Sequence, residues 1–111
     1  MNPPEPTITI QQLKSILEKD RNEVLLIDVR SKEEFETQHI PGAVNVPSNG
    51  IMEFANDASE RDKTIVTICN HGGNRSQSAA QTLRDSGLKS SYLEGGTAGW
   101  YDEESTVPSI H

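Results

Sequence analysis

The sequence contains a single cysteine, Cys69, and the residues that follow it could make its thiol a nucleophile. A run of apolar and β-branched residues at 64–68 ends directly before the thiol. Two glycines, Arg75 and Ser76 come next, followed by a stretch typical of a helix. A strand that turns through glycines into a helix points its loop N–H groups inward, and the helix N-terminus adds partial positive charge. This field stabilises a thiolate, so the pattern favours a reactive Cys69 over an inert thiol buried at a strand end.

The loop after Cys69 is predicted to bind the substrate through Asn70, His71, Gly72, Gly73, Asn74, Arg75 and Ser76. The guanidinium fork of Arg75 suits a sulfonate or phosphate group; the alternative is that it pairs with a carboxylate and shapes the loop. Ser76 could donate a hydrogen bond to a persulfide, and it could also be the N-cap of the following helix. His71 could act as a general base. Because the loop amides and the helix N-terminus already stabilise a thiolate, we interpret His71 as an ordinary loop residue.

Length and composition limit the classes of protein and partner. A chain of 111 residues is long enough for one domain with a single core. Its net charge of −7 argues against nucleic acid and anionic membrane surfaces as partners. One cysteine excludes an internal disulfide, and Cys69 with His71 offers too few ligands for a metal site, so we expect neither metal nor organic cofactor. Because the first residues lack a basic and apolar leader and no run could span a membrane, we expect a cytoplasmic protein.

Short apolar runs alternate with amphipathic stretches along the chain. We expect a polar segment at residues 1–6, one domain at 7–101 and an acidic tail at 102–111, with a polar linker at 57–62 inside the domain. Strands are predicted at 7–8, 24–29, 43–46, 64–69 and 91–93, and helices at 10–19, 32–35, 51–54, 76–85 and 98–100. Capping boxes, formed by Thr9 with Gln12 and by Ser31 with Glu34, predict where the first two helices begin. This alternation predicts a parallel sheet that helices cover on both faces.

Polar residues follow two of the predicted strands. In open parallel sheets, ligands bind beyond the carboxyl ends of the strands. Asp28 and Arg30 lie at the end of one buried strand, as Cys69 lies at the end of another, so we expect both strand ends to line one crevice. Asp28 and Arg30 could touch the substrate there. We favour the interpretation that they support the neighbouring loops.

Several motifs resemble the rhodanese domain. They are LIDVR at residues 26–30, EEF at 33–35, HIPGAVNVP at 39–47, the cysteine loop ending in GNRS at 73–76, and LEGGTAGW at 93–100. The resemblance covers about residues 7–101. It implies an α/β fold of the single-domain rhodanese-like type, with a five-stranded parallel sheet flanked by helices on both faces. It also implies a sulfurtransferase in which Cys69 carries sulfane sulfur as a persulfide. The usual donor in this family is thiosulfate, a small anion, and the acceptor is cyanide or another thiol, to which we add a protein acceptor.

The cysteine loop departs from the family pattern in its length. Sulfurtransferases of the family typically place four residues between the cysteine and the arginine, whereas five separate Cys69 from Arg75. The longer spacing is typical of the phosphatase and arsenate-reductase branches of the fold, although these usually carry histidine where this chain has Ile68. Three functions therefore stay open: a thiosulfate sulfurtransferase, which we favour; a phosphatase or arsenate reductase; and a non-catalytic sulfur carrier or binding module.

Overall fold

A computed structural model of the protein describes residues 7–57 and 62–105. The expected N-terminal segment at 1–6, residues 58–61 of the expected linker, and residues 106–111 of the expected tail lie outside the described residues. The described part holds a five-stranded sheet made of β1 (Thr7–Ile8), β2 (Val24–Asp28), β3 (Val44–Asn45), β4 (Thr64–Ile68) and β5 (Lys89–Leu93). The strand order is β1-β5-β4-β2-β3, and all pairs are parallel. The predicted parallel sheet is confirmed.

Helices connect the strands and cover the sheet. They are α1 (Ile10–Asp20), α2 (Lys32–Thr37), α3 (Ile51–Asn56), α4 (Asn74–Asp85) and α5 (Gly96–Ser105), with short 3₁₀ turns at Arg21–Glu23 and Ser48–Gly50. Both predicted capping boxes are confirmed. At the first, the Gln12 N–H donates to Thr9 Oγ1 over 3.1 Å, and the Thr9 N–H donates to Gln12 Oε1 over 2.9 Å. Local capping therefore fixes where α1 and α2 begin.

Several helix boundaries differ from those expected, among them the start of α4 and both ends of α5. Helix α4 begins at Asn74 instead of Ser76, and its N-cap is Gly73, so the interpretation of Ser76 as the N-cap is wrong. Ser76 lies in the first turn of the helix and donates from its hydroxyl to the Gly73 carbonyl over 3.2 Å. Helix α5 runs from Gly96 to Ser105, so the predicted helix at 98–100 is too short at both ends. No glycine or proline interrupts residues 100–105, and the Tyr101 hydroxyl anchors the helix by donating to the His39 carbonyl over 2.6 Å.

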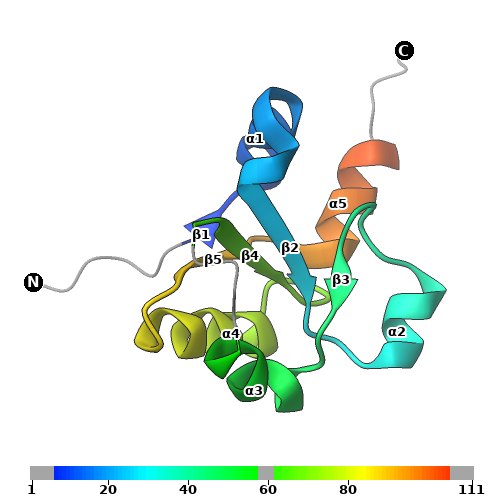
Figure 1. The fold of residues 1–111 in the computed structure, drawn as a ribbon. Coiled ribbons are helices and arrows are strands. Elements are labelled where there is room, and N and C mark those ends of the chain that lie inside the picture. The colour runs from blue at the N-terminus through cyan, green and yellow to red at the C-terminus, as the bar shows by residue number, and fades with distance from the viewer. Residues whose placement is uncertain (1–6, 58–61, 106–111) are drawn as a thin grey trace, which may run out of the picture.

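The core consists of two apolar layers, one on each face of the sheet. Alternate residues of β4 point to opposite faces, so Ile65 and Val66 belong to different layers. One layer packs under α1 and includes Leu13. The other packs under α3 and α4 and includes Cys69. Figure 1 shows α1 and α5 on one side of the sheet and α3 and α4 on the other. Cys69 therefore lies on the α4 side.

Candidate active site

Cys69 follows the last residue of β4 at the carboxyl-end edge of the sheet. The neighbouring strand β2 ends at the same level, because Asp28 is paired with Ile68 and the Val29 N–H donates to the Ile68 carbonyl over 2.8 Å. The chain then turns through residues 70–73 and enters α4. This arrangement brings the thiol, the loop and the first turn of α4 together at the edge where ligands bind in parallel sheets.

Two groups of the loop and helix contact the sulfur of Cys69. The Gly73 N–H donates to Sγ over 3.0 Å, and Sγ lies 3.2 Å from the Ser76 hydroxyl oxygen. The side chain of Cys69 is buried, with 3% of its surface exposed. Burial raises the pKa of the Cys69 thiol, but the hydrogen bonds from Ser76, Gly73 and His71 together lower it below its ordinary value. Because a hydroxyl proton rotates freely, Ser76 can turn its O–H to the sulfur once the thiol ionises.

This lowered pKa predicts the pH dependence of Cys69 alkylation. Ionisation should be complete at a lower pH than for a free thiol, so the rate with iodoacetamide should reach half its maximum clearly below about pH 8.5. The measurement is the alkylation rate between pH 4 and 10, followed by intact mass. Ser76→Ala is the matched variant, and its midpoint should be higher because one hydrogen bond to the thiolate is lost. A wild-type midpoint at or above that of the free thiol would contradict the prediction.

Gly72 gives the cysteine loop a backbone conformation that a residue with a side chain could not adopt without strain. This glycine has a φ of +77°, in the left-handed region, and a Cβ atom there would lie 2.8 Å from the Leu93 carbonyl oxygen. Its own carbonyl accepts a hydrogen bond from the Gln77 side chain over 3.1 Å. The loop is thus held between β5 and the first turns of α4. His71 is exposed at the outer side of this loop.

The N-terminal turn of α5 also holds the cysteine loop in place, through backbone hydrogen bonds. The Thr97 N–H donates to the Cys69 carbonyl and the Ala98 N–H to the Asn70 carbonyl, both over 2.9 Å. Gly96 has a φ of +58°, and a Cβ atom there would lie 2.2 Å from the Cys69 carbonyl oxygen. This contact leaves no space for a side chain at Gly96, so the backbone of α5 fixes the position of Cys69.

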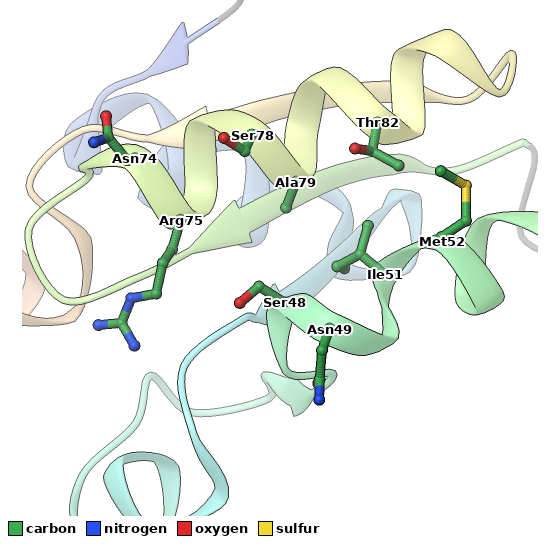
Figure 2. A pocket seen from close by; sticks show the side chains of 9 residues that line it. All are labelled: Ser48, Asn49, Ile51, Met52, Asn74, Arg75, Ser78, Ala79 and Thr82. Carbon is green, nitrogen blue, oxygen red and sulfur yellow. The ribbon is translucent and has the colours of Figure 1, made fainter.

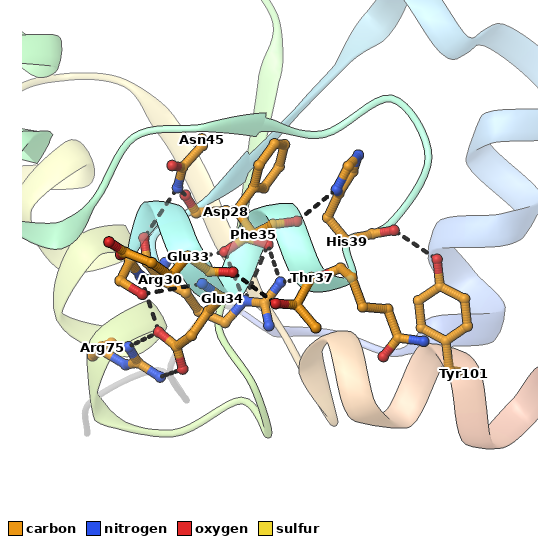
Figure 3. A network of polar contacts seen from close by, with 12 residues as sticks. Asp28, Arg30, Glu33, Glu34, Phe35, Thr37, His39, Asn45, Arg75 and Tyr101 are labelled. Atoms are coloured by element: carbon orange, nitrogen blue, oxygen red, sulfur yellow. Dashed lines mark hydrogen bonds and ion pairs between the residues drawn. The ribbon is translucent and has the colours of Figure 1, made fainter.

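Arg75 is paired with a carboxylate on α2. Its Nη1 lies 2.9 Å from Glu34 Oε1 and its Nη2 lies 3.3 Å from Oε2, a two-point contact between side chains that are 43% and 39% exposed. Figure 3 shows the guanidinium reaching Glu34. The hydrogen bond from Arg75 is the largest cause that lowers the pKa of Glu34, to about 2. The structure thus brings Arg75 to a carboxylate, the arrangement that the sequence left as an alternative to substrate binding.

Asp28 and Arg30 form a buried ion pair beside the loop. Arg30 Nη2 lies 2.8 Å from Asp28 Oδ2, and its Nε lies 2.9 Å from Oδ1. The guanidinium also donates to the Gln38 carbonyl beyond α2. The Asn45 side chain donates to the carbonyls of Asp28 and Arg30, both over 3.0 Å. This network, also drawn in Figure 3, ties the end of β2 to α2 and β3.

A pocket of about 360 Å³ adjoins the start of α4. Figure 2 shows it between α4 and the segment that leads into α3. Its walls are Ser48, Asn49, Ile51, Met52, Asn74, Arg75, Ser78, Ala79 and Thr82. Asn74 and Arg75 belong to the predicted substrate loop, and Ile51 and Ala79 share the apolar layer of Cys69. The pocket therefore borders the candidate site, although Cys69 is not among its walls.

Sequence reasoning missed three residues that support the loop: Thr67, Gln77 and Gly96. The Thr67 hydroxyl donates to the Ser76 carbonyl over 2.8 Å. Thr67 precedes Cys69 by two residues on the strand, so the two-residue period already places both side chains on one face. No local sequence pattern predicts the contact of Gly96 with the cysteine loop, because these two segments are far apart in the sequence and meet only in the folded protein.

The fold and the site together define a small α/β domain that presents a cysteine in a loop between a parallel strand and a helix. The rhodanese-like domain family matches residues 9–103, and the chain belongs to this family. It is similar to the thiosulfate sulfurtransferase GlpE of Pseudomonas syringae pv. syringae (strain B728a), with 40% identity over 77 residues that cover 68% of this chain and 71% of that protein.

Two further comparisons agree with the family. The putative sulfur carrier protein YrkF of Bacillus subtilis (strain 168) is 38% identical over 84 residues, which cover 76% of this chain and 44% of that protein. The chain thus spans less than half the length of this relative. The solved rhodanese-like domain of Alr3790 from Anabaena sp. superposes with a TM-score of 0.78 at 27% identity, covering 96% of this chain and 87% of that one.

In the part of the chain that the structure describes, none of the helices is long and apolar enough to cross a membrane. Within residues 7–57 and 62–105, no three His, Cys, Asp or Glu side chains are grouped so that they could hold a metal ion.

Proposed function

We propose that the protein is a sulfurtransferase that moves sulfane sulfur from a small anionic donor such as thiosulfate to a nucleophilic acceptor through a persulfide on Cys69. The observation that carries this proposal is the convergence of the Gly73 N–H and the Ser76 hydroxyl on Sγ. These groups stabilise a negative sulfur, which is the attacking form before transfer and the leaving form after it. The names of the relatives support the same chemistry.

In the first step the Cys69 thiolate attacks the outer sulfur of thiosulfate. A new S–S bond forms, the S–S bond of thiosulfate breaks, and sulfite leaves with the electron pair of that bond. In the second step an acceptor such as cyanide or a thiolate, free or on a protein, attacks the outer sulfur of the persulfide. The Cys69 thiolate then leaves and is stabilised again by Gly73 and Ser76. We assign Arg75 to the binding of the anionic donor, which requires its contact with Glu34 to open.

A sulfur carrier that hands its persulfide to one partner protein is the second candidate, and the name of the Bacillus subtilis relative favours it. This carrier would form the same persulfide on Cys69 but would pass it only slowly to cyanide or small thiols. A phosphatase or arsenate reductase would likewise need Arg75 to leave Glu34, and it would also need the loop N–H groups arranged around the oxygens of a phosphoryl or arsenyl group.

The deciding experiment is to incubate the purified protein with thiosulfate and to measure its intact mass. We expect the gain of one sulfur atom on the peptide that contains Cys69, and its removal by cyanide with the release of thiocyanate. Cys69→Ser is the control and should gain nothing. Rapid loading with slow release to cyanide would indicate the carrier. Hydrolysis of an aryl phosphate without any gain of sulfur would overturn the proposal in favour of the oxyanion enzyme.

A further inference from the structure

Thr67 is a buried polar residue directly beneath the candidate site. Its side chain is fully buried, and its hydroxyl donates to the Ser76 carbonyl over 2.8 Å. A second contact of the same hydroxyl, to the Ser91 carbonyl, is longer at 3.4 Å. Because a hydroxyl has one proton to donate, the shorter contact is the principal bond. Thr67 thus joins β4 to the first turn of α4.

This bond reaches the residue that also contacts the nucleophile. Ser76 Oγ lies 3.2 Å from the sulfur of Cys69, and the backbone of Ser76 is a second group that lowers the pKa of that thiol. The N-cap of α4, Gly73, makes no side-chain hydrogen bond. No N-cap side chain therefore holds the start of α4, and the Thr67 hydroxyl makes a different contact from the strand, to the carbonyl of Ser76 in the first turn.

We propose that Thr67 is a positioning residue for Cys69, whose hydroxyl fixes Ser76 so that the hydroxyl oxygen and the backbone of Ser76 stay within hydrogen-bonding distance of the sulfur. Thr67 acts through Ser76 and does not contact the substrate. The inference rests on the proposed function only in taking Cys69 as the nucleophile. Its consequence is that the ionisation of Cys69 depends on a strand residue two positions earlier in the chain.

Thr97 provides a matched control for the loss of a buried threonine hydroxyl. It is also buried, with 1% of its surface exposed, and it lies beside the same loop through the hydrogen bond of its N–H to the Cys69 carbonyl. Its hydroxyl, however, has no hydrogen-bond partner among the described residues. Thr97→Val therefore keeps shape and burial and removes no hydrogen bond, whereas Thr67→Val keeps shape and removes one.

The test is the alkylation rate of Cys69 with iodoacetamide as a function of pH, in wild type, Thr67→Val, Thr67→Ser and Thr97→Val. For Thr67→Val we expect the midpoint to rise by about half to one pH unit, less than a fully lost hydrogen bond to a charged group would give. Thr67→Ser retains the hydroxyl and should restore the wild-type midpoint. Thr97→Val should leave the midpoint unchanged.

Two outcomes would overturn the proposal. One is an unchanged midpoint in Thr67→Val, and the other is an equal shift in Thr97→Val, which would show a general response to altered packing. Circular dichroism establishes that each variant folds, and Thr67→Ala replaces Thr67→Val if the valine variant does not. Failure of the proposed function would be seen separately, as a wild-type protein with an ionised Cys69 that takes up no sulfur from thiosulfate.

Discussion

Gly96→Ala is expected to remove most of the activity and a large part of the stability, although Gly96 carries no reactive group. A Cβ atom at this position would lie 2.2 Å from the Cys69 carbonyl oxygen and 2.7 Å from the Asn70 carbonyl carbon. Both are backbone atoms, which cannot rotate away as the end of a flexible side chain can. The φ of +58° adds strain for any residue with a side chain. To fit alanine, the loop or α5 must move, and the hydrogen bonds from Thr97 and Ala98 to the loop must lengthen.

The expected loss of stability follows from overpacking at Gly96, and the expected loss of rate follows from displacement of Cys69. Overpacking costs about 1–3 kcal/mol, and each kcal/mol lowers the melting temperature of a domain of this size by about 4–8 °C. We therefore expect a decrease of roughly 10 °C. A nucleophile displaced by about 1 Å can lose on the order of a hundredfold in rate.

The measurements for Gly96→Ala are the thermal unfolding midpoint and the rate of persulfide formation from thiosulfate. Gly50→Ala is the matched control, because a Cβ atom there meets only Val46 Cγ1 at 3.7 Å, an ordinary contact. The control should stay near wild type in both measurements. Wild-type stability and sulfur transfer in Gly96→Ala would show that the loop can move without loss, and the role of α5 would have to be abandoned.

The predictable parts of this fold are those with local causes. The start of α1 was predicted because Thr9 and Gln12 are three residues apart and satisfy each other's backbone N–H groups. Strands β2 and β4 were predicted because strands buried on both faces form nearly continuous runs of apolar and β-branched residues. The position of Cys69 at a strand end follows from the same pattern. Each of these signals is contained in a few consecutive residues.

The parts that could not be predicted depend on contacts between distant segments. Glu34 and Arg75 are 41 residues apart, and nothing in either local sequence indicates that they meet. Gly96 approaches Cys69 only because α5 returns to the carboxyl edge of the sheet. The end of α5 was misplaced for a related reason, since Tyr101 is held by the carbonyl of His39. Local sequence thus predicted that Cys69 follows a strand and precedes a helix, but not which distant residues hold the cysteine loop in place.

The pair formed by Arg75 and Glu34 gives the second large expected effect. If Arg75 binds the anionic donor, Arg75→Ala should raise the Michaelis constant for thiosulfate about tenfold or more, since a hydrogen bond to a charged group contributes roughly 1.5–3 kcal/mol. The lower end applies here because both side chains are partly exposed. Glu34→Gln removes the competing charge, so it should lower the same constant. Two variants of one ion pair should then change donor binding in opposite directions.

The opposite signs separate substrate binding from a structural role. If the pair only shapes the loop, breaking it from either side loosens the same contact, and both variants should weaken catalysis or leave it unchanged.

The assay belongs between pH 6 and 8, because the pKa of Glu34 near 2 keeps this carboxylate ionised there. The folded pKa lies below that of the unfolded chain, so the stability that the pair contributes is complete above about pH 4.5 and is lost as the pH falls towards 2. Alkylation of Cys69 by neutral iodoacetamide serves as the control. It should change little in either variant, because Arg75 is assigned to the donor and the groups that contact the sulfur are on Gly73 and Ser76.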